Sequence, residues 1–106
     1  MSRILVVDDE SLMREFISES LLSQGYEVDC AENGVRALEL LSGEPYDAIL
    51  TDYEMPKVTG MDVLRRAREK MPDAKVIVMT AYGTIENAVE AMKIGAYHYI
   101  TKPFGL

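Results

Sequence analysis

The sequence predicts a single α/β domain, residues 1–106, built on a five-stranded parallel β-sheet. Short apolar runs alternate with longer segments whose apolar residues recur at helical spacing, the pattern of repeated strand–helix units. Some of the runs contain no polar residue, as expected for strands that helices cover on both faces. With 106 residues, 48% of them hydrophobic, the chain fits one compact domain with a modest core.

Five runs are the predicted strands. The unbroken apolar runs Ile4–Val7, Ala48–Leu50 and Val76–Met79 are expected at the centre of the sheet. Tyr26–Cys30 alternates apolar with polar residues, so one of its faces should meet water and the strand belongs at an edge. Tyr97–Ile100 is also mixed and is expected at the opposite edge.

Four helices are expected between these strands. They end near Gly25, at Gly43 and Pro45, at Pro72 and at Gly95, residues that stop helices. Most of the seven methionines fall at core positions of this pattern. The residues that recur at helical spacing are Leu12, Met13, Phe16, Ile17 and Leu21; Val35, Leu38 and Leu41; Met61, Leu64, Ala67 and Met71; and Ile85, Ala88, Val89 and Met92.

Composition narrows the function classes. No apolar run approaches the roughly 20 residues of a membrane helix, and the N-terminus lacks the pattern of a signal peptide, so we expect a cytoplasmic protein without membrane contact. The net charge of −7 argues against direct contact with nucleic acid. The lone cysteine, Cys30, excludes an internal disulfide and is expected to be a small buried residue.

Polar residues follow the predicted strands at their carboxyl ends. Asp8 and Asp9 follow the first strand, Asp52 the third, Thr80 the fourth and Lys102 the fifth. In an open parallel sheet these ends share one rim, where ligands bind. Each residue also has an ordinary interpretation: Asp9 as a helix cap, Asp52 in a turn, Thr80 bonded to an amide, Lys102 solvated. Their joint arrival at one rim favours a functional site.

The residue types at this rim suit phosphoryl transfer. Clustered carboxylates favour a hard cation such as Mg²⁺, and an aspartate can itself serve as a nucleophile that becomes phosphorylated. Such a transfer needs a positive group beside the negatively charged phosphoryl oxygens, which Lys102 can supply. It also needs hydrogen bonds to these oxygens, which Thr80 can donate.

Four motifs carry a resemblance to a known family. "VVDDE", "TDYEMPKVTG", "MTAYGT" and "YHYITKPF" occur in order at the ends of the predicted strands. Together they resemble the receiver domain of bacterial two-component response regulators, and "TAYGT" is similar to receivers of the NtrC subfamily, which control transcription. The resemblance implies a doubly wound, flavodoxin-like sheet of strand order 2-1-3-4-5.

The resemblance also implies roles for individual residues. Asp52 would be phosphorylated by a sensor histidine kinase. Asp9 would bind Mg²⁺ directly and Asp8 through water, together with Asp52 and the main-chain carbonyl of Glu54. Thr80 would be the switch hydroxyl.

Further expectations follow from the resemblance. Tyr99 would be the switch aromatic, and Lys102 would bind the phosphate, ahead of a cis bond to Pro103. The family usually continues into a fifth helix, whereas the sequence given ends at Leu106, so we expect a domain truncated before that helix. An uncovered face with Phe104 would then favour either a homodimer or a chain markedly less stable than one extended by the fifth helix. The output domain, or another protomer, would be a further partner.

Two alternatives to a phosphorylation switch stay open at this point. A pseudo-receiver would act only as a binding module, but it typically lacks the acceptor, an acid or the lysine. A haloacid-dehalogenase-type phosphatase would carry Asp-x-Asp after the first strand, where this chain has an adjacent pair and Glu10 takes the spacing. A switch of this kind is not an enzyme beyond slow self-phosphorylation and self-dephosphorylation, and the only histidine, His98, is not expected to take part.

Overall fold

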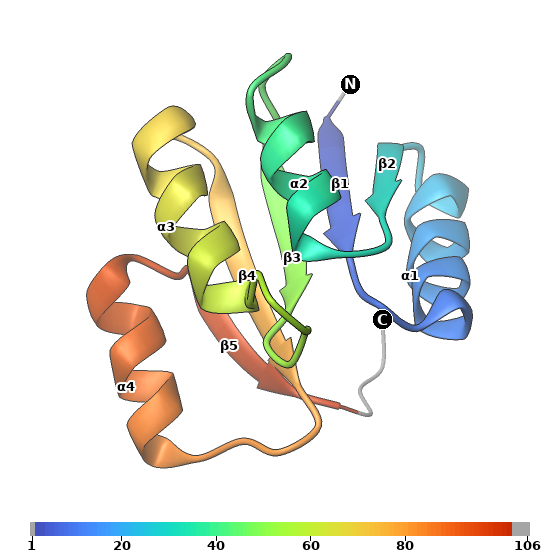
Figure 1. Cartoon of the computed structure of the whole chain (residues 1–106). Coiled ribbons are helices and arrows are strands. Elements are labelled where there is room, and N and C mark those ends of the chain that lie inside the picture. The colour runs from blue at the N-terminus through green and yellow to red at the C-terminus, as the bar shows by residue number, and fades with distance from the viewer. Residues whose placement is uncertain (1, 103–106) are drawn as a thin grey trace.

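The computed structural model describes residues 2–102, which form a five-stranded parallel sheet of order β2-β1-β3-β4-β5 (Figure 1). The strands are β1 (Arg3–Val7), β2 (Glu27–Ala31), β3 (Ala48–Asp52), β4 (Lys75–Thr80) and β5 (His98–Thr101). The helices are α1 (Ser11–Ser23), α2 (Gly34–Leu41), α3 (Gly60–Lys70) and α4 (Ile85–Ile94). The predicted fold class, strand order and edge strands are confirmed. Pro103 and Phe104 lie outside the described residues.

The helices cover the two faces of the sheet unequally. In Figure 1, α2 and α3 lie side by side over one face, and together with α4 they bury the larger core cluster. On the other face, the smaller cluster includes Ile17 of α1, and Met13 and Leu21 of the same helix pack against it. Within residues 2–102, no helix is long and apolar enough to cross a bilayer.

Some residues predicted to face the core are exposed. Cys30 is exposed rather than buried, because it lies on an edge strand near the end of the sheet. The helical spacing marked a wider stripe than each helix buries: Leu12 is 79% exposed and Ile85 84%. A helix against one sheet buries a single stripe, so residues flanking that stripe reach solvent. The others exposed in this way are Phe16, Val35, Val89 and Met92.

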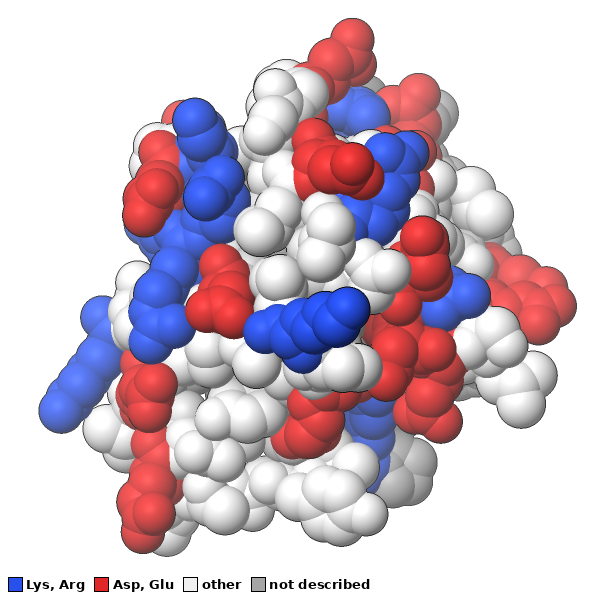
Figure 2. All heavy atoms as spheres, in the orientation of Figure 1, with Lys and Arg blue, Asp and Glu red and all other residues white. Residues whose placement is uncertain are grey.

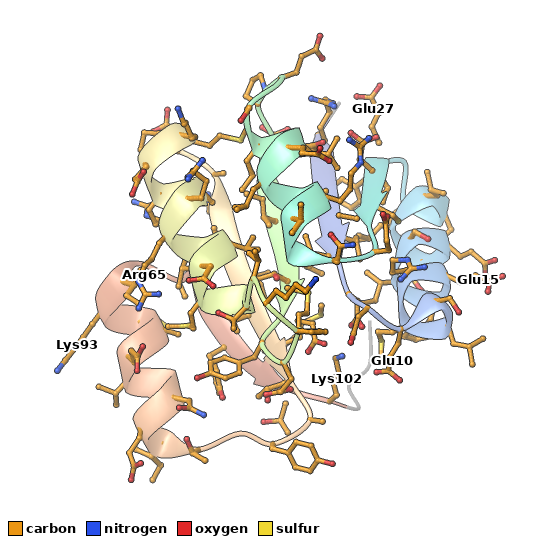
Figure 3. All side chains as sticks on the ribbon, in the orientation of Figure 1. Glu10, Glu15, Glu27, Arg65, Lys93 and Lys102 are labelled. Atoms are coloured by element: carbon orange, nitrogen blue, oxygen red, sulfur yellow. The ribbon has the colours of Figure 1, made fainter. Side chains whose placement is uncertain are left out.

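Charged side chains are interspersed on the surface of the molecule. Figure 2 shows basic and acidic side chains mixed on one face, with bases gathered over α3. Arg65 of α3 lies 3.6 Å from Glu90 of α4, an ion pair between exposed groups that links the two helices (Figure 3). Exposed pairs of this kind stabilise a fold little, so apolar packing holds α3 and α4 in place.

The start of α3 is held against the end of β3. Thr59 and Asp62 form a reciprocal capping box that begins the helix. Gly60, which directly follows Thr59, packs so closely against β3 that an added Cβ would lie 2.1 Å from the carbonyl oxygen of Asp52. Only glycine fits there without moving the backbone. The fold thereby fixes the main chain at Asp52.

We expect Gly60→Ala to lower the free energy of unfolding by about 3 kcal/mol or more, because the new methyl group overlaps backbone atoms that cannot move aside cheaply. Gly43→Ala is the matched control: its Cβ would meet the Leu40 carbonyl oxygen at 3.5 Å, an ordinary contact. Urea denaturation of both variants measures the difference. Equal midpoints for the two would show that the contact between α3 and β3 is not tight.

Candidate functional site

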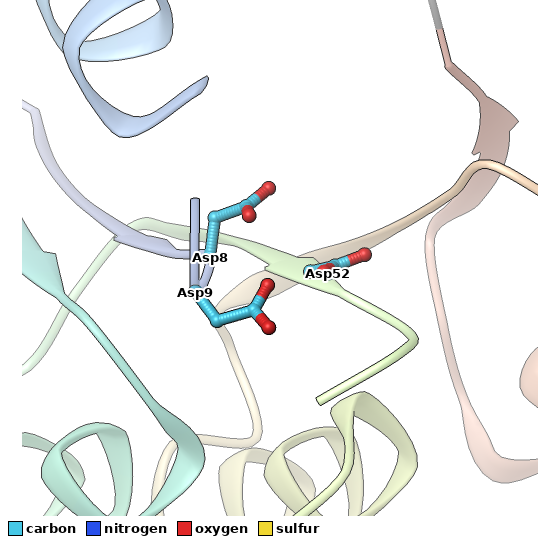
Figure 4. Close-up of side chains that lie close together, drawn as sticks. All are labelled: Asp8, Asp9 and Asp52. Atoms are coloured by element: carbon cyan, nitrogen blue, oxygen red, sulfur yellow. The ribbon is translucent and has the colours of Figure 1, made fainter. Parts of the chain in front are cut away.

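The predicted rim residues come together at the carboxyl ends of the strands. Asp8, Asp9 and Asp52 each offer a carboxylate oxygen, and these oxygens lie within 4.8 Å of one another (Figure 4). Asp8 and Asp52 are buried, whereas Asp9 is exposed. Asp9 is not the N-cap of α1, because Glu10 takes that position without a side-chain hydrogen bond. The ordinary interpretation of Asp9 as a helix cap is therefore wrong.

Lys102 reaches into the acidic cluster (Figure 3). Its Nζ lies 2.7 Å from Oδ2 of Asp8 and 3.3 Å from Oδ1 of Asp52, and its side chain is only 8% exposed. A hydrogen bond of 2.7 Å from the Lys102 amide to the Thr80 carbonyl holds the end of β5 beside β4. Lys102 is therefore not a solvated lysine. Its ammonium lies between two buried carboxylates.

The carboxyl group of Asp52 is electrostatically strained. Burial raises its pKa to about 7, the negative charge of Asp8 adds to this rise, and Lys102 opposes it without cancelling it. Within the described residues, the buried Oδ1 of Asp52 meets the Lys102 ammonium only at ion-pair distance, 3.3 Å, and accepts no close hydrogen bond. A buried carboxylate oxygen that is so weakly compensated is costly inside a protein, so this oxygen is available to a cation or an electrophile.

The charge of the cluster matches a divalent cation. Burial lowers the pKa of Lys102, but the hydrogen bond to Asp8 and the charge of Asp52 outweigh it, so the net shift is upward and the ammonium stays charged. The cluster brings three carboxyl groups against a single ammonium, so negative charge is in excess when the acids are ionised. The all-oxygen donor set, the charge and the open side at Asp9 together fit Mg²⁺.

The two oxygens of Asp8 are already occupied. Oδ1 accepts the backbone N–H of Glu10 at 2.9 Å, and Oδ2 accepts the Lys102 ammonium at 2.7 Å. The carboxylate of Asp9, in contrast, is exposed on the open side of the cluster. The two neighbouring acids therefore differ: Asp8 is held by the protein, and Asp9 is free to turn towards a ligand.

Thr80 contacts a residue whose side chain the sequence did not single out. Its buried hydroxyl donates a hydrogen bond to Oε2 of Glu54, and the Ala81 N–H donates to Oε1 of the same carboxylate at 3.3 Å. The Tyr82 N–H in turn donates to Oγ1 of Thr80 at 3.0 Å. No sequence signal predicts this contact, because residues 54 and 80 meet only through the loops after β3 and β4.

Tyr99 lies under the loop that follows Thr80. Its ring packs edge-on against Tyr53 with 6.4 Å between centroids, and its hydroxyl is buried without a hydrogen bond in the part of the chain described. A Cβ on Gly83 would lie 3.7 Å from both the Tyr99 ring and the Thr80 methyl group. Thr80 and Tyr99 thus both lie next to Gly83, in the loop between β4 and α4. His98 is exposed and packs against Tyr97, with 4.8 Å between ring centroids.

We expect Asp52→Asn to stabilise the metal-free protein, and to do so more at pH 8 than at pH 5. The pKa is about 7 in the folded state and about 3.9 in the unfolded chain. Between these values the native state binds more protons than the unfolded state, so wild-type stability falls as pH rises. Asparagine carries no such dependence, and its advantage should reach about 2–4 kcal/mol above pH 7.

Denaturant melts at the two pH values, in the presence of a chelator, measure this effect. Asp73→Asn, which removes an exposed aspartate from the loop before β4, is the matched control and should change stability little at either pH. An advantage of Asp52→Asn that is the same at pH 5 and pH 8 would contradict the raised pKa of Asp52.

Comparisons with known proteins agree with this geometry. The family model described as "Response regulator receiver domain" matches residues 4–106. Regulatory protein AtoC of Escherichia coli (strain K12) is 42% identical over 106 residues, which are 100% of this chain and 23% of that protein. The chain thus spans about a quarter of the length of this curated relative.

Solved structures show the same fold. The response regulator protein TrrA of Thermotoga maritima, crystallised in complex with Mg²⁺ and BeF, is 43% identical with a TM-score of 0.85, and the match covers 99% of this chain and 90% of that one. A Burkholderia pseudomallei response regulator with a phosphorylated aspartic acid and a calcium ion is 31% identical with a TM-score of 0.94, covering 99% and 62%. This chain belongs to the response regulator receiver domains, the phospho-accepting switches of two-component signalling.

Proposed function

We propose that Asp52 accepts a phosphoryl group from a sensor histidine kinase in a reaction that depends on Mg²⁺. The observation that supports this role is the buried Oδ1 of Asp52, which among the described residues accepts no close hydrogen bond and meets only the Lys102 ammonium, at an ion-pair distance of 3.3 Å. In the transfer, this carboxylate attacks phosphorus, an O–P bond forms, and the bond from phosphorus to the donor's histidine nitrogen breaks. The imidazole leaves with the electron pair and takes up a proton.

The residues that would hold Mg²⁺ are Asp8, Asp9, Asp52 and the main-chain carbonyl of Glu54. Asp9 is suited to direct coordination because it is exposed and lies beside the open side of the cluster. Asp8 is suited to contact through water, because both of its oxygens already accept hydrogen bonds. When bound, the cation neutralises charge on the phosphoryl oxygens and on the acids, so that Asp52 is ionised at neutral pH.

Lys102 and Thr80 complete the proposed site. The Lys102 ammonium lies beside the nucleophile and can pair with a phosphoryl oxygen, while the buried Thr80 hydroxyl can donate a hydrogen bond to another. A hydroxyl drawn towards Asp52 leaves its place beside the loop, and Tyr99, whose own hydroxyl has no described partner, can shift into the space. Thr80 and Tyr99 would thus convert phosphorylation into a new surface around α4 and β5.

The proposed readers of that surface are an output domain or a second protomer. Control of transcription through such an output domain, as the resemblance to NtrC-type receivers suggests, and a cytoplasmic location remain part of this proposal. Self-association is also a prediction: Ala48, Ile77 and Ile100 are only partly buried on the face where α1 packs. A pseudo-receiver has no observation in its favour, because the acceptor, the acids and the lysine all converge.

We expect incubation with acetyl phosphate and Mg²⁺ to add one phosphoryl group at Asp52, seen by intact mass and located by peptide mapping. Asp52→Asn should abolish the adduct, because an amide is not a nucleophile for phosphorus. Asp73→Asn, an exposed loop aspartate, should be labelled like wild type. Labelling of Asp52→Asn to the wild-type level would refute the assignment of Asp52 as the acceptor.

We expect Mg²⁺ to raise the free energy of unfolding of the wild type by about 2.7 kcal/mol at a hundred times its Kd, since it binds only the folded state. Asp9→Asn should weaken Mg²⁺ affinity about tenfold or more in calorimetric titration, because it removes a charged ligand. Asp73→Asn again serves as the control. Equal Mg²⁺ affinities for wild type and Asp9→Asn would remove Asp9 from the coordination shell.

A further inference from the structure

The Glu54 side chain binds two hydrogen-bond donors at once. The Thr80 hydroxyl donates to Oε2 and the Ala81 N–H donates to Oε1 at 3.3 Å, so each carboxylate oxygen is used. The donors belong to the last residue of β4 and to the residue that follows it. A hydroxyl and an amide directed at one carboxylate form a site for an anion. In this structure, Glu54 is the anion that fills it.

This two-donor site lies beside the phosphoacceptor. Asp52 pairs with Met79 in the β3–β4 register, which places Thr80 one residue further along the neighbouring strand. The pairing of the two backbones continues past Asp52, because the Tyr53 N–H donates a hydrogen bond to the Met79 carbonyl at 2.7 Å. A phosphoryl group on Asp52 would therefore reach the donors that Glu54 occupies.

We propose that the Glu54 carboxylate is an internal competitor of the phosphoryl group for the Thr80 hydroxyl and the Ala81 N–H. This inference rests on the proposed function of Asp52 and gives the Glu54 side chain a role distinct from that of its main-chain carbonyl. In the unphosphorylated domain, Glu54 holds Thr80 and the loop after β4. Phosphorylation displaces the carboxylate, both by taking its donors and by like-charge repulsion.

The exposure of the partners makes this exchange feasible. Thr80 is fully buried, so its hydroxyl needs an acceptor in either state, whereas Glu54 is an exposed residue that can turn into solvent. Water then solvates the released carboxylate, so its release costs little. The contact between Glu54 and the two donors is correspondingly modest in strength. Glu54 should therefore tune the phosphorylation equilibrium without blocking it.

The test is a titration with beryllium fluoride and Mg²⁺, a stand-in for a phosphoryl group on the aspartate, followed by ¹⁹F NMR. Glu54→Gln keeps the shape of the side chain but removes its charge. We expect it to tighten the apparent Kd by about threefold to tenfold. In the metal-free protein, the same substitution should shift the amide resonance of Ala81, which loses a charged acceptor.

Glu10→Gln is the matched control. It removes one negative charge from the same rim, since Oε1 of Glu10 lies 3.8 Å from the Lys102 Nζ, and its side chain is likewise exposed, at 69%. Equal tightening in Glu10→Gln and Glu54→Gln would show a general field effect and overturn the inference. An unchanged or weaker Kd in Glu54→Gln would also overturn it, because the side chain would then not compete.

A double-mutant cycle with Thr80→Ala isolates the proposed competition. If Glu54 acts by occupying the Thr80 hydroxyl, Glu54→Gln should tighten the Kd for beryllium fluoride less in the Thr80→Ala background, where that hydroxyl is missing. A gain of the same size in the Thr80→Ala background would place the effect elsewhere. Failure of the proposed function has a different signature: beryllium fluoride would not bind the wild type, and Asp52→Asn would behave no differently from it.

Discussion

The ion pair that joins Lys102 to both Asp8 and Asp52 is the interaction on which the site depends. Two buried carboxylates beside each other repel and are poorly solvated, and one ammonium at 2.7 and 3.3 Å offsets part of that cost. The offset is incomplete, since the pKa of Asp52 remains raised to about 7. The fold thus holds a reactive carboxylate at some cost, and a divalent cation would relieve the remaining repulsion.

The two sides of the site differ in how firmly they are held. On the acidic side, Asp8 accepts two hydrogen bonds, and the close packing of Gly60 fixes the main chain at Asp52. On the other side, residues 81–86 are all exposed, and Ala91 is the only buried residue of α4. Elements with little buried apolar surface open at low free energy. A rigid acceptor beside a loosely packed loop and helix is the arrangement that a switch requires.

The strands, the helices and the central or edge position of each strand could be predicted from periodicity, because periodicity reports directly on burial, whereas the strand order followed from the family resemblance. Ile4–Val7 and Val76–Met79 are unbroken apolar runs, and both became central strands. The errors have a common physical reason. Periodicity locates the buried side of a helix but not its width, so Leu12 and Ile85 were assigned to a stripe that extends past the sheet. Cys30 was misjudged because burial at an edge strand depends on which neighbour covers it.

The sequence by itself determined which residues reach the rim, since parallel strands end at one edge and Asp8, Asp9, Asp52, Thr80 and Lys102 follow those ends. Tertiary structure alone decided which partner each of these residues contacts and which of them stays exposed. It bound Asp8 to Lys102, left Asp9 exposed, and joined Thr80 to the Glu54 side chain, because hydrogen bonds between loops depend on distances that no local pattern encodes. Residue types and their spacing indicate which chemical groups reach the rim. The hydrogen-bond partners of these groups on other loops are set only when the chain has folded.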